Sequence, residues 1–313
     1  MVAFSLEGRR IWVAGERGMV GRALMRRISE EPCHLLSAPP RADLDLRRQD
    51  AVNAWVRENR PDLIFVAAAT VGGIHANDSR PGEFLYDNLM IEANIIDAAR
   101  TAGVEKLVML GSSCIYPKFA EQPIKETALL SGPLELTNEW YAVAKIAGIK
   151  LCQAYRKQYD CDFISVQPTN LYGPYDNFDL TSSHVLPALI RKAHEAKTKS
   201  AKDFMIWGSG TPLREFLHVD DLADALVFLA KNYSGLEIVN VGSGSEISIG
   251  ELARLIARVV GFRGQVELDP TKPDGTPRKL VDSGKLESLG WRASIGLEEG
   301  VKQTYQWYLN SLQ

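Results

Sequence analysis

Two side chains that could exchange protons lie four positions apart in the segment NEWYAVAKIAG, Tyr141 and Lys145. Residues at this spacing share one face of a helix. A tyrosine normally keeps its proton up to a pKa of about 10, and a nearby ammonium lowers that value, so the phenol could act as an acid or base near neutral pH. With Ser112 donating a hydrogen bond to a carbonyl oxygen, the three residues would form a set that reduces a ketone. A lone Y-x-x-x-K also recurs by chance on helix surfaces, so its context must decide.

Ser112 belongs to the segment LGSSCIYPK, in which the apolar run 107–110 ends abruptly in small polar residues. Buried parallel strands deliver side chains to a site in this way, at their carboxyl ends. Cys114 lies two residues after Ser112, so we expect it on the same side of an extended segment. The residues alone favour a packing role for Cys114 and an ordinary loop position for His184.

A glycine-rich turn follows the first apolar run, with the spacing G-x-x-G-x-x-G at Gly15, Gly18 and Gly21. Glycines allow a tight turn and a close approach of the backbone to a pyrophosphate, and the start of the following helix attracts phosphate. Between a first strand and a first helix, this motif predicts a dinucleotide site.

The second predicted strand ends in Ser-Ala-Pro-Pro-Arg without the acidic residue that would hold the ribose of NAD. Arg41, together with Arg17 in the glycine turn, could clamp the 2′-phosphate of NADP by charge-assisted hydrogen bonds. Both could instead be solvated arginines, with Asp43 as a ribose acceptor. We predict NADP.

Short apolar runs alternate with longer amphipathic ones through the first half of the chain. This alternation predicts an α/β fold of the Rossmann type, a doubly wound parallel sheet joined by right-handed crossovers. We expect residues 1–168 to bind the dinucleotide and 169–313 to form mainly a smaller α/β substrate-binding lobe, with some elements returning to the first domain. The predicted strands are 11–14, 35–37, 63–67, 106–110, 163–167, 204–207 and 237–241, and the predicted helices are 20–29, 51–59, 83–103, 138–159, 221–231 and 249–260, with an exposed loop at 197–202.

Composition narrows the class of ligand. The 313 residues carry 36 basic and 39 acidic side chains, a net charge of −3, with no basic stripe for nucleic acid or an anionic membrane. Four cysteines show neither C-x-x-C spacing nor the density of a disulfide-rich domain, and no segment has the apolar length of a signal peptide core or a membrane helix. We therefore expect a cytoplasmic protein with a small-molecule substrate, no metal site, no nucleic-acid partner and no membrane partner.

The glycine turn, the serine after the fourth strand, Tyr141 with Lys145, and LHVDDLADA at 217–225 resemble the extended short-chain dehydrogenase/reductases. A narrower resemblance is to the epimerase/reductases of that family that act on GDP-4-keto-6-deoxymannose. It runs from residue 15 to about 309 and includes these segments: GERGMVG, VGGI, GSSCIYP, YAVAKIAGIKLC, PTNLYGPYDNF, SHVLPAL, WGSGTPLREFLHVDDLADA, KPDGTPRKL and TYQWYL.

This resemblance implies a two-step, NADPH-dependent conversion of GDP-4-keto-6-deoxymannose to GDP-L-fucose. The C4 ketone acidifies the hydrogens on C3 and C5, so that Cys114 as base and His184 as acid could invert both centres. Tyr141, supported by Lys145 and Ser112, would then protonate the C4 oxygen during reduction. The resemblance also implies a homodimer, formed through a four-helix bundle that includes the two longest helices.

Further contacts are implied residue by residue. Cofactor contacts fall on Gly15, Arg17, Gly18, Met19, Val20, Gly21, Arg41, Leu110, Gly111, Ser113, Lys145, Pro168, Asn170, Leu171 and His184. Cationic residues for the substrate diphosphate are Arg214 and Lys192; Trp207 could pack on sugar or base, and Asp274 could bind the nucleotide or sugar. The last three could equally be a solvated helix residue, a core residue and a turn former.

Two positions depart from the family pattern, which often has lysine at Thr70 and histidine at Glu16. Glu16 lies in the predicted phosphate-binding turn, where its charge could weaken cofactor affinity. Two rival functions remain at this stage. One is a nucleotide-sugar 4-epimerase that keeps its NAD(P) and needs neither Cys114 nor His184. The other is a dinucleotide sensor without catalysis, in which the Y-x-x-x-K pair should be broken.

Overall fold

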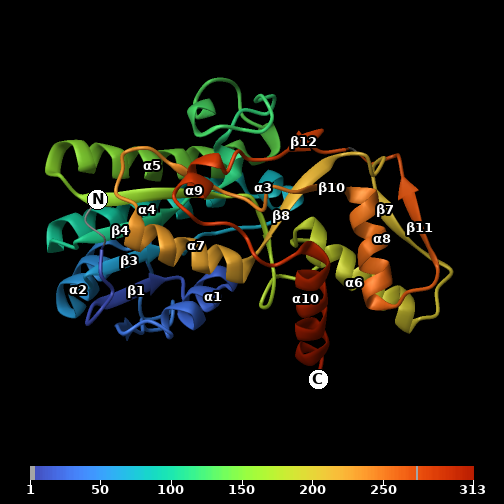
Figure 1. The fold of residues 1–313 in the computed structure, drawn as a ribbon, viewed down its shortest axis with the longest axis horizontal. Helices are drawn as coiled ribbons and strands as arrows, with labels where there is room; N and C mark the ends of the chain where they lie inside the picture. Colours follow the sequence, from blue (N-terminus) through green and yellow to red (C-terminus); the bar gives the residue numbers. More distant parts are fainter. Residues whose placement is uncertain (1–3, 273) are drawn as a thin grey trace.

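A parallel six-stranded sheet forms the centre of the larger lobe, on the left in Figure 1. The computed structural model describes residues 4–272 and 274–313. The strand order is β2-β1-β3-β4-β5-β9, and every pairing is parallel. The strands are β1 (Arg10–Ala14), β2 (His34–Leu36), β3 (Leu63–Val66), β4 (Lys106–Leu110), β5 (Asp162–Pro168) and β9 (Val239–Val241).

Helices cover both faces of this sheet because successive strand residues point to opposite sides. Ile11 and Val13 pack in one apolar cluster with α1 (Met19–Ile28) and α7 (Val219–Asn232). Trp12 and Ala14 pack in another cluster, with the remaining three helices of the lobe. Those are α2 (Gln49–Asn59), α4 (Pro81–Ala102) and α5 (Glu139–Tyr159). The predicted doubly wound α/β fold is therefore confirmed.

The smaller lobe, on the right in Figure 1, is built around two further sheets. One contains β10 (Glu246–Ser248), β8 (Leu213–His218) and β12 (Arg278–Lys279) in that order, with β6 (Asn170–Tyr172) also paired to β8. The other pairs β7 (Asp203–Trp207) with β11 (Gln265–Asp269) in parallel. Three helices pack together here, α6 (Val185–Thr198), α8 (Ile249–Val260) and α10 (Leu297–Ser311).

Five short elements complete the described part of the chain. They are α3 (Ile74–Ser79), α9 (Gly284–Ser288) and the 3-10 turns η1 (Ser113–Ile115), η2 (Glu126–Ala128) and η3 (Leu136–Asn138). Within the described residues, no helix combines the length and the apolar character that a membrane span needs.

Several predicted boundaries were wrong. Strand β2 begins and ends one residue earlier than predicted, and β9 is limited to three residues. The exposed loop predicted at 197–202 begins later, because α6 continues to Thr198 and Lys197 donates a hydrogen bond to the Val260 carbonyl at the end of α8. Cys152, in α5, is 1% exposed and packs in the core.

Candidate active site

The glycine turn joins β1 to α1 and has no room for side chains at two positions. A Cβ on Gly15, whose φ is +94°, would lie 2.7 Å from the Ala68 nitrogen, and a Cβ on Gly21 would lie 2.7 Å from the Glu16 Cα atom. Gly18 precedes α1 without any side-chain cap. The first N–H groups of the helix are thus left for another acceptor, which suits an anionic phosphate.

Charged side chains connect this turn to the end of β2. The Glu16 carboxylate accepts hydrogen bonds from the Ser37 hydroxyl at 3.2 Å and the Ala38 nitrogen at 3.3 Å. Arg17 donates to the Ala38 carbonyl at 3.4 Å. The Glu16 carboxylate and the Arg17 guanidinium therefore both reach the end of β2, where Rossmann folds bind the adenosine ribose.

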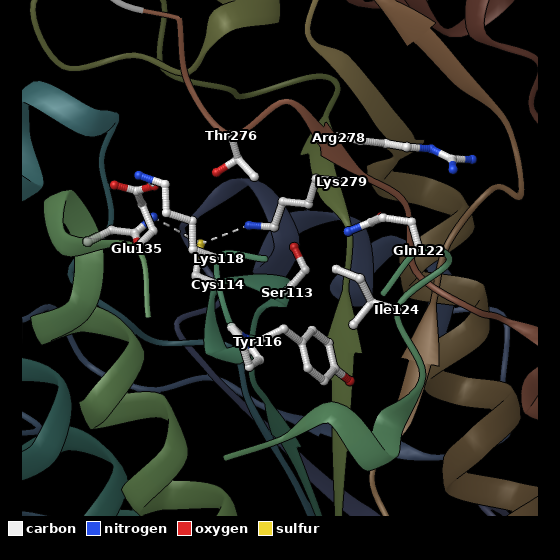
Figure 2. A pocket seen from close by; sticks show the side chains of 12 residues that line it. Ser113, Cys114, Tyr116, Lys118, Gln122, Ile124, Glu135, Thr276, Arg278 and Lys279 are labelled. Atoms are coloured by element: carbon white, nitrogen blue, oxygen red, sulfur yellow. Dashed lines mark hydrogen bonds and ion pairs between the residues drawn. The ribbon is translucent and has the colours of Figure 1, made fainter. Parts of the chain in front are cut away.

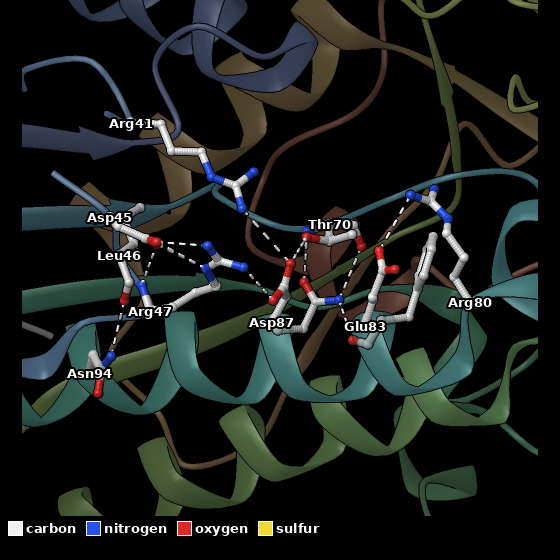
Figure 3. A network of polar contacts seen from close by, with 11 residues as sticks. Arg41, Asp45, Leu46, Arg47, Thr70, Arg80, Glu83, Asp87 and Asn94 are labelled. Carbon is white, nitrogen blue, oxygen red and sulfur yellow. Dashed lines mark hydrogen bonds and ion pairs between the residues drawn. The ribbon is translucent and has the colours of Figure 1, made fainter. Parts of the chain in front are cut away.

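Arg41 lies farther along the same segment, in a polar network above α4 (Figure 3). Its guanidinium is 69% exposed and lies 3.9 Å from the Asp87 carboxylate. Asp87 is held more closely by Arg47, at 3.0 Å, and accepts a hydrogen bond from the Thr70 hydroxyl at 3.2 Å. Thr70 therefore has a structural partner here, which explains its presence.

The segment after β4 is fixed by a buried amide. Ser112 donates its backbone N–H to Gln167 Oε1 at 3.0 Å, and Gln167 is fully buried. A Cβ on Gly111 would lie 2.6 Å from Gln167 Cδ, so a glycine is needed at that position. The Ser112 hydroxyl accepts the Cys114 N–H at 3.2 Å and starts the η1 turn, which brings the hydroxyl and the thiol into one small region.

Tyr141, near the start of α5, faces this region. Burial raises the pKa of its phenol to about 12, while the charge of Lys145 and hydrogen bonding by Ser112 act in the opposite direction. The charge of Lys145 lowers the pKa of Tyr141 as expected, but desolvation has the larger effect and the net shift is upward. A phenol with this pKa is a proton donor, not a base, at physiological pH.

Lys145 is buried with its charge compensated. Its side chain is 2% exposed, donates to the Leu110 carbonyl at 2.8 Å and lies 2.9 Å from Glu92 Oε1 on α4. Burial opposes the positive charge, but Glu92 outweighs burial and the pKa of Lys145 is raised. The ammonium lies 5.7 Å from the centre of the Tyr141 ring.

Cys114 lines a pocket together with residues of the loop that follows η1 and of β12 (Figure 2). Lys279, on β12, points its ammonium at the sulfur from 3.5 Å (Figure 2), and the Asn138 amide nitrogen lies 3.6 Å from the same sulfur. The sulfur thus has one cationic and one neutral nitrogen donor beside it.

His184 immediately precedes α6 and keeps a solvent-accessible side chain. Surrounding protein partly desolvates the imidazole, and this lowers its pKa; the positive charge of Lys279 lowers it further. Lys279 therefore acts electrostatically on His184 and also contacts Cys114, although the two residues lie 70 positions apart in the sequence.

The four residues predicted for substrate form two pairs. Lys192 and Trp207 are close, with the ammonium 5.7 Å from the centre of an indole that is 60% exposed. Burial lowers the pKa of Arg214, and Asp274 counteracts this. Asp274 also accepts hydrogen bonds from the Ser209 nitrogen at 2.9 Å and hydroxyl at 2.7 Å, so it stabilises the local loop.

A family comparison agrees with this geometry. Residues 11–242 match the model of the NAD dependent epimerase/dehydratase family. The chain belongs to this family.

Relatives in the epimerase/dehydratase family cover nearly the whole chain. A GDP-L-fucose synthase from Sinorhizobium fredii is 58% identical over 100% of this chain and 99% of the relative. One from Escherichia coli is 51% identical, over 96% of this chain and 97% of the relative. The crystal structure of a GDP-L-fucose synthetase from Naegleria fowleri bound to NADP is 32% identical, with a TM-score of 0.91 and coverage of 99% and 97%.

Similarity extends to a GDP-mannoheptose C4 reductase from Campylobacter jejuni, solved with NADP bound. It is 34% identical, with a TM-score of 0.87 over 98% of this chain and 99% of that chain. Within the epimerase/dehydratase family, the chain groups with the GDP-L-fucose synthases.

Three contacts in this epimerase/dehydratase site were missed by sequence reasoning. Asn138 and Lys279 contact the Cys114 sulfur, and Glu92 pairs with Lys145. Lys279 lies inside KPDGTPRKL, a segment that carried the family resemblance, so its motif was a usable signal. Glu92 gave none, because an acidic residue in an amphipathic helix is ordinarily solvated.

Proposed function

We propose that the protein is a GDP-L-fucose synthase. It converts GDP-4-keto-6-deoxymannose to GDP-L-fucose by epimerising C3 and C5 and then reducing the C4 ketone with NADPH. The observation that carries this proposal is the Cys114 thiol, hydrogen-bonded through its backbone to Ser112 and approached by Lys279. A simple ketone reduction or a 4-epimerisation needs Ser112, Tyr141 and Lys145 but no thiol.

The epimerisation uses acidity that the ketone itself creates. Loss of a proton from C3 or C5 leaves an enolate, and Cys114 as thiolate accepts that proton. His184 returns a proton from the opposite face, which inverts the centre. The Lys279 ammonium, 3.5 Å from the sulfur, places a positive charge where the thiol would exchange its proton.

Reduction follows in the same pocket. NADPH, when bound, would supply the hydride that C4 accepts. Tyr141 donates its proton to the C4 oxygen, and its raised pKa keeps that proton available at neutral pH. The Ser112 hydroxyl donates a hydrogen bond to the same oxygen in both steps, where negative charge develops.

The cofactor site assigned to this chain follows the carboxyl ends of the parallel strands. The pyrophosphate would rest on the turn Gly15–Gly21, in which Gly15 and Gly21 have no room for a side chain and the helix start is uncapped. Arg17 and Arg41 would bind the 2′-phosphate of NADP. The residues that would hold the nicotinamide half are Leu110, Gly111, Ser113, Lys145, Pro168, Asn170, Leu171 and His184.

Substrate is bound mainly by the smaller lobe. Arg214 and Lys192 neutralise the diphosphate, Trp207 packs on the base or sugar, and Asp274 contributes through the loop it stabilises. This assignment divides the chain into a dinucleotide lobe at 1–168 and a mainly substrate-binding lobe at 169–313.

The active species is a cytoplasmic homodimer. Helices α4 and α5 pack side by side in each chain and leave large apolar side chains outside, with Tyr86 60% exposed and Trp140 and Val143 each 43% exposed. Pairing of these faces would complete a four-helix bundle. The free thiols of all four cysteines support a reducing compartment.

The test is incubation of the purified protein with GDP-4-keto-6-deoxymannose and NADPH, followed by loss of nicotinamide absorbance and identification of the sugar. The wild type should yield GDP-L-fucose. Cys114→Ser should still oxidise NADPH but give an unepimerised 6-deoxyhexose, since removing a general base costs on the order of a hundredfold or more in rate. Cys33→Ser serves as the matched control, because Cys33 is distant in sequence from Cys114 and its thiol contacts the Ile28 carbonyl instead.

Two outcomes count against the proposal. Absence of net NADPH oxidation by the wild type would favour a 4-epimerase that returns its hydride. An unchanged product and rate in Cys114→Ser would remove the thiol from the chemistry, although the reductase assignment would survive.

A further inference from the structure

The interface between α4 and α5 buries a carboxylate that the proposed reaction does not use. Glu92 is 1% exposed and lies within the apolar packing of the two helices. Its Oε1 atom is 2.9 Å from Lys145 Nζ. Among the described residues, neither carboxylate oxygen has a hydrogen-bond partner, so this ion pair is the contact that compensates its charge. A buried carboxylate with one partner is costly, so its single interaction calls for a reason.

The neighbouring helix is shaped to accept this carboxylate. Gly148 lies one turn after Lys145, and a Cβ there would overlap Glu92 Oε2 and lie 2.8 Å from Met109 Cε. Any larger residue at position 148 would displace the carboxylate from the ammonium. The arrangement is therefore a fitted site within α5, not a chance contact of two long side chains.

Lys145 and Glu92 depend on each other for their charges. Burial raises the pKa of the Glu92 carboxyl and the Lys145 ammonium opposes this rise, while Glu92 raises the pKa of Lys145 against the effect of burial. The Leu110 carbonyl accepts a hydrogen bond from the ammonium, and the Glu92 carboxylate lies within ion-pair distance of it.

We propose that Glu92 is a positioning residue for the reduction, which holds the Lys145 ammonium in place and keeps it charged beside Tyr141. The inference rests on the reductase role proposed for Tyr141 and Lys145. It adds Glu92, which does not line the pocket beside Cys114, to the reductase residues Ser112, Tyr141 and Lys145.

Few other titratable groups act on this pair. Tyr141 interacts electrostatically with Lys145, Glu92 and Cys114, and Glu92 interacts with Cys152, which lies two turns after Lys145 on α5. Lys145 carries the only positive charge among these groups. Loss of that charge would therefore change the electrostatic environment of Tyr141 more than a change at Glu92 or Cys114 would.

The experiment compares Glu92→Gln with wild type from pH 6 to pH 8.5, as the ratio of their rates of substrate-dependent NADPH oxidation at each pH. Glutamine keeps the shape and removes the charge, so Lys145 should lose its proton near neutral pH. We expect the ratio to fall by roughly tenfold or more between pH 6 and pH 8.5. Glu92→Asp keeps the charge and should restore a constant ratio.

Asp162→Asn is the matched control, because Asp162 also pairs with a buried lysine of the sheet, Lys106, at 2.7 Å. It should lower thermal stability without changing the pH dependence of the rate. A ratio for Glu92→Gln that is equal at every pH would overturn the inference, since a structural role predicts a uniform loss. Failure of the wild type to oxidise NADPH would instead overturn the proposed function.

If Glu92→Gln does not fold, a second measurement on the wild type tests the same proposal. In wild type labelled with ¹³C at lysine Cε, the Lys145 resonance, assigned by its absence from Lys145→Met, should keep the chemical shift of an ammonium up to about pH 10. A titration midpoint below pH 8 would refute the role of Glu92.

Discussion

Replacing Gly148 with alanine should destabilise the protein, contrary to the usual effect of this change in a helix. Alanine is favoured over glycine inside a helix by about 1 kcal/mol. Here the added methyl group would overlap Glu92 Oε2 and lie 2.8 Å from Met109 Cε and 3.1 Å from Glu92 Cδ. Both neighbours are buried, so neither can move into solvent.

The expected magnitude follows from two costs that exceed the helix gain. Overfilling a packed interior costs about 1–3 kcal/mol, and breaking a buried ion pair costs about 3–5 kcal/mol when one charge is left alone. Because the carboxylate is displaced and not removed, we expect a net loss of about 2–4 kcal/mol in the free energy of unfolding. An unfolding entropy of about 2.1 cal/mol/K per residue converts this to a fall of roughly 3–6 °C in Tm.

Urea unfolding, monitored by tryptophan fluorescence and by circular dichroism, measures the change. Gly82→Ala is the control, since Gly82 lies in the first turn of α4 and nothing lies within 4 Å of a Cβ placed there. That variant should be as stable as wild type or up to about 1 kcal/mol more stable. If Gly148→Ala matched Gly82→Ala, the fitted arrangement of Glu92 against α5 would be refuted.

Two further predictions concern the pocket and the cofactor turn. Lys279→Met keeps the side-chain length but removes the charge 3.5 Å from the Cys114 sulfur. Incorporation of solvent deuterium at C3 and C5 of the substrate should therefore slow by roughly tenfold, while the reduction step is retained. Incorporation at the wild-type rate would contradict the role of Lys279. Glu16→Gln removes a negative charge from the end of β2, so 2′,5′-ADP should bind about fivefold tighter in calorimetry while 5′-ADP changes less. A similar gain for both ligands would mean that Glu16 does not face the 2′-phosphate.

Much of the fold could be predicted because its signals are local. Apolar runs such as 106–110 and the glycines at 15, 18 and 21 define strands and a phosphate turn within a few residues. The ends of helices and strands were predicted less accurately. Helix α6 continues two residues into the predicted loop 197–202, where the Lys197 ammonium donates a hydrogen bond to the Val260 carbonyl.

The site was predicted in its residue types but not in its electrostatics. Spacing showed that Tyr141 and Lys145 share a helix face, yet only the packed structure shows that burial dominates the phenol. Glu92 is 53 positions from Lys145, and Lys279 is 165 from Cys114, so neither contact leaves a trace in local sequence. Pairings of this kind are set by the tertiary fold.

The position of β9 in the large sheet also bears on how the chain folds as it is synthesised. This strand pairs with β5, although 70 residues, which include β6, α6, β7 and β8 of the smaller lobe, separate Pro168 from Val239. At about 5–20 residues per second, a ribosome needs roughly 4–14 s to add them. During that interval β5 has an open edge that can pair with other nascent chains, so its buried residues are a transient target for chaperones.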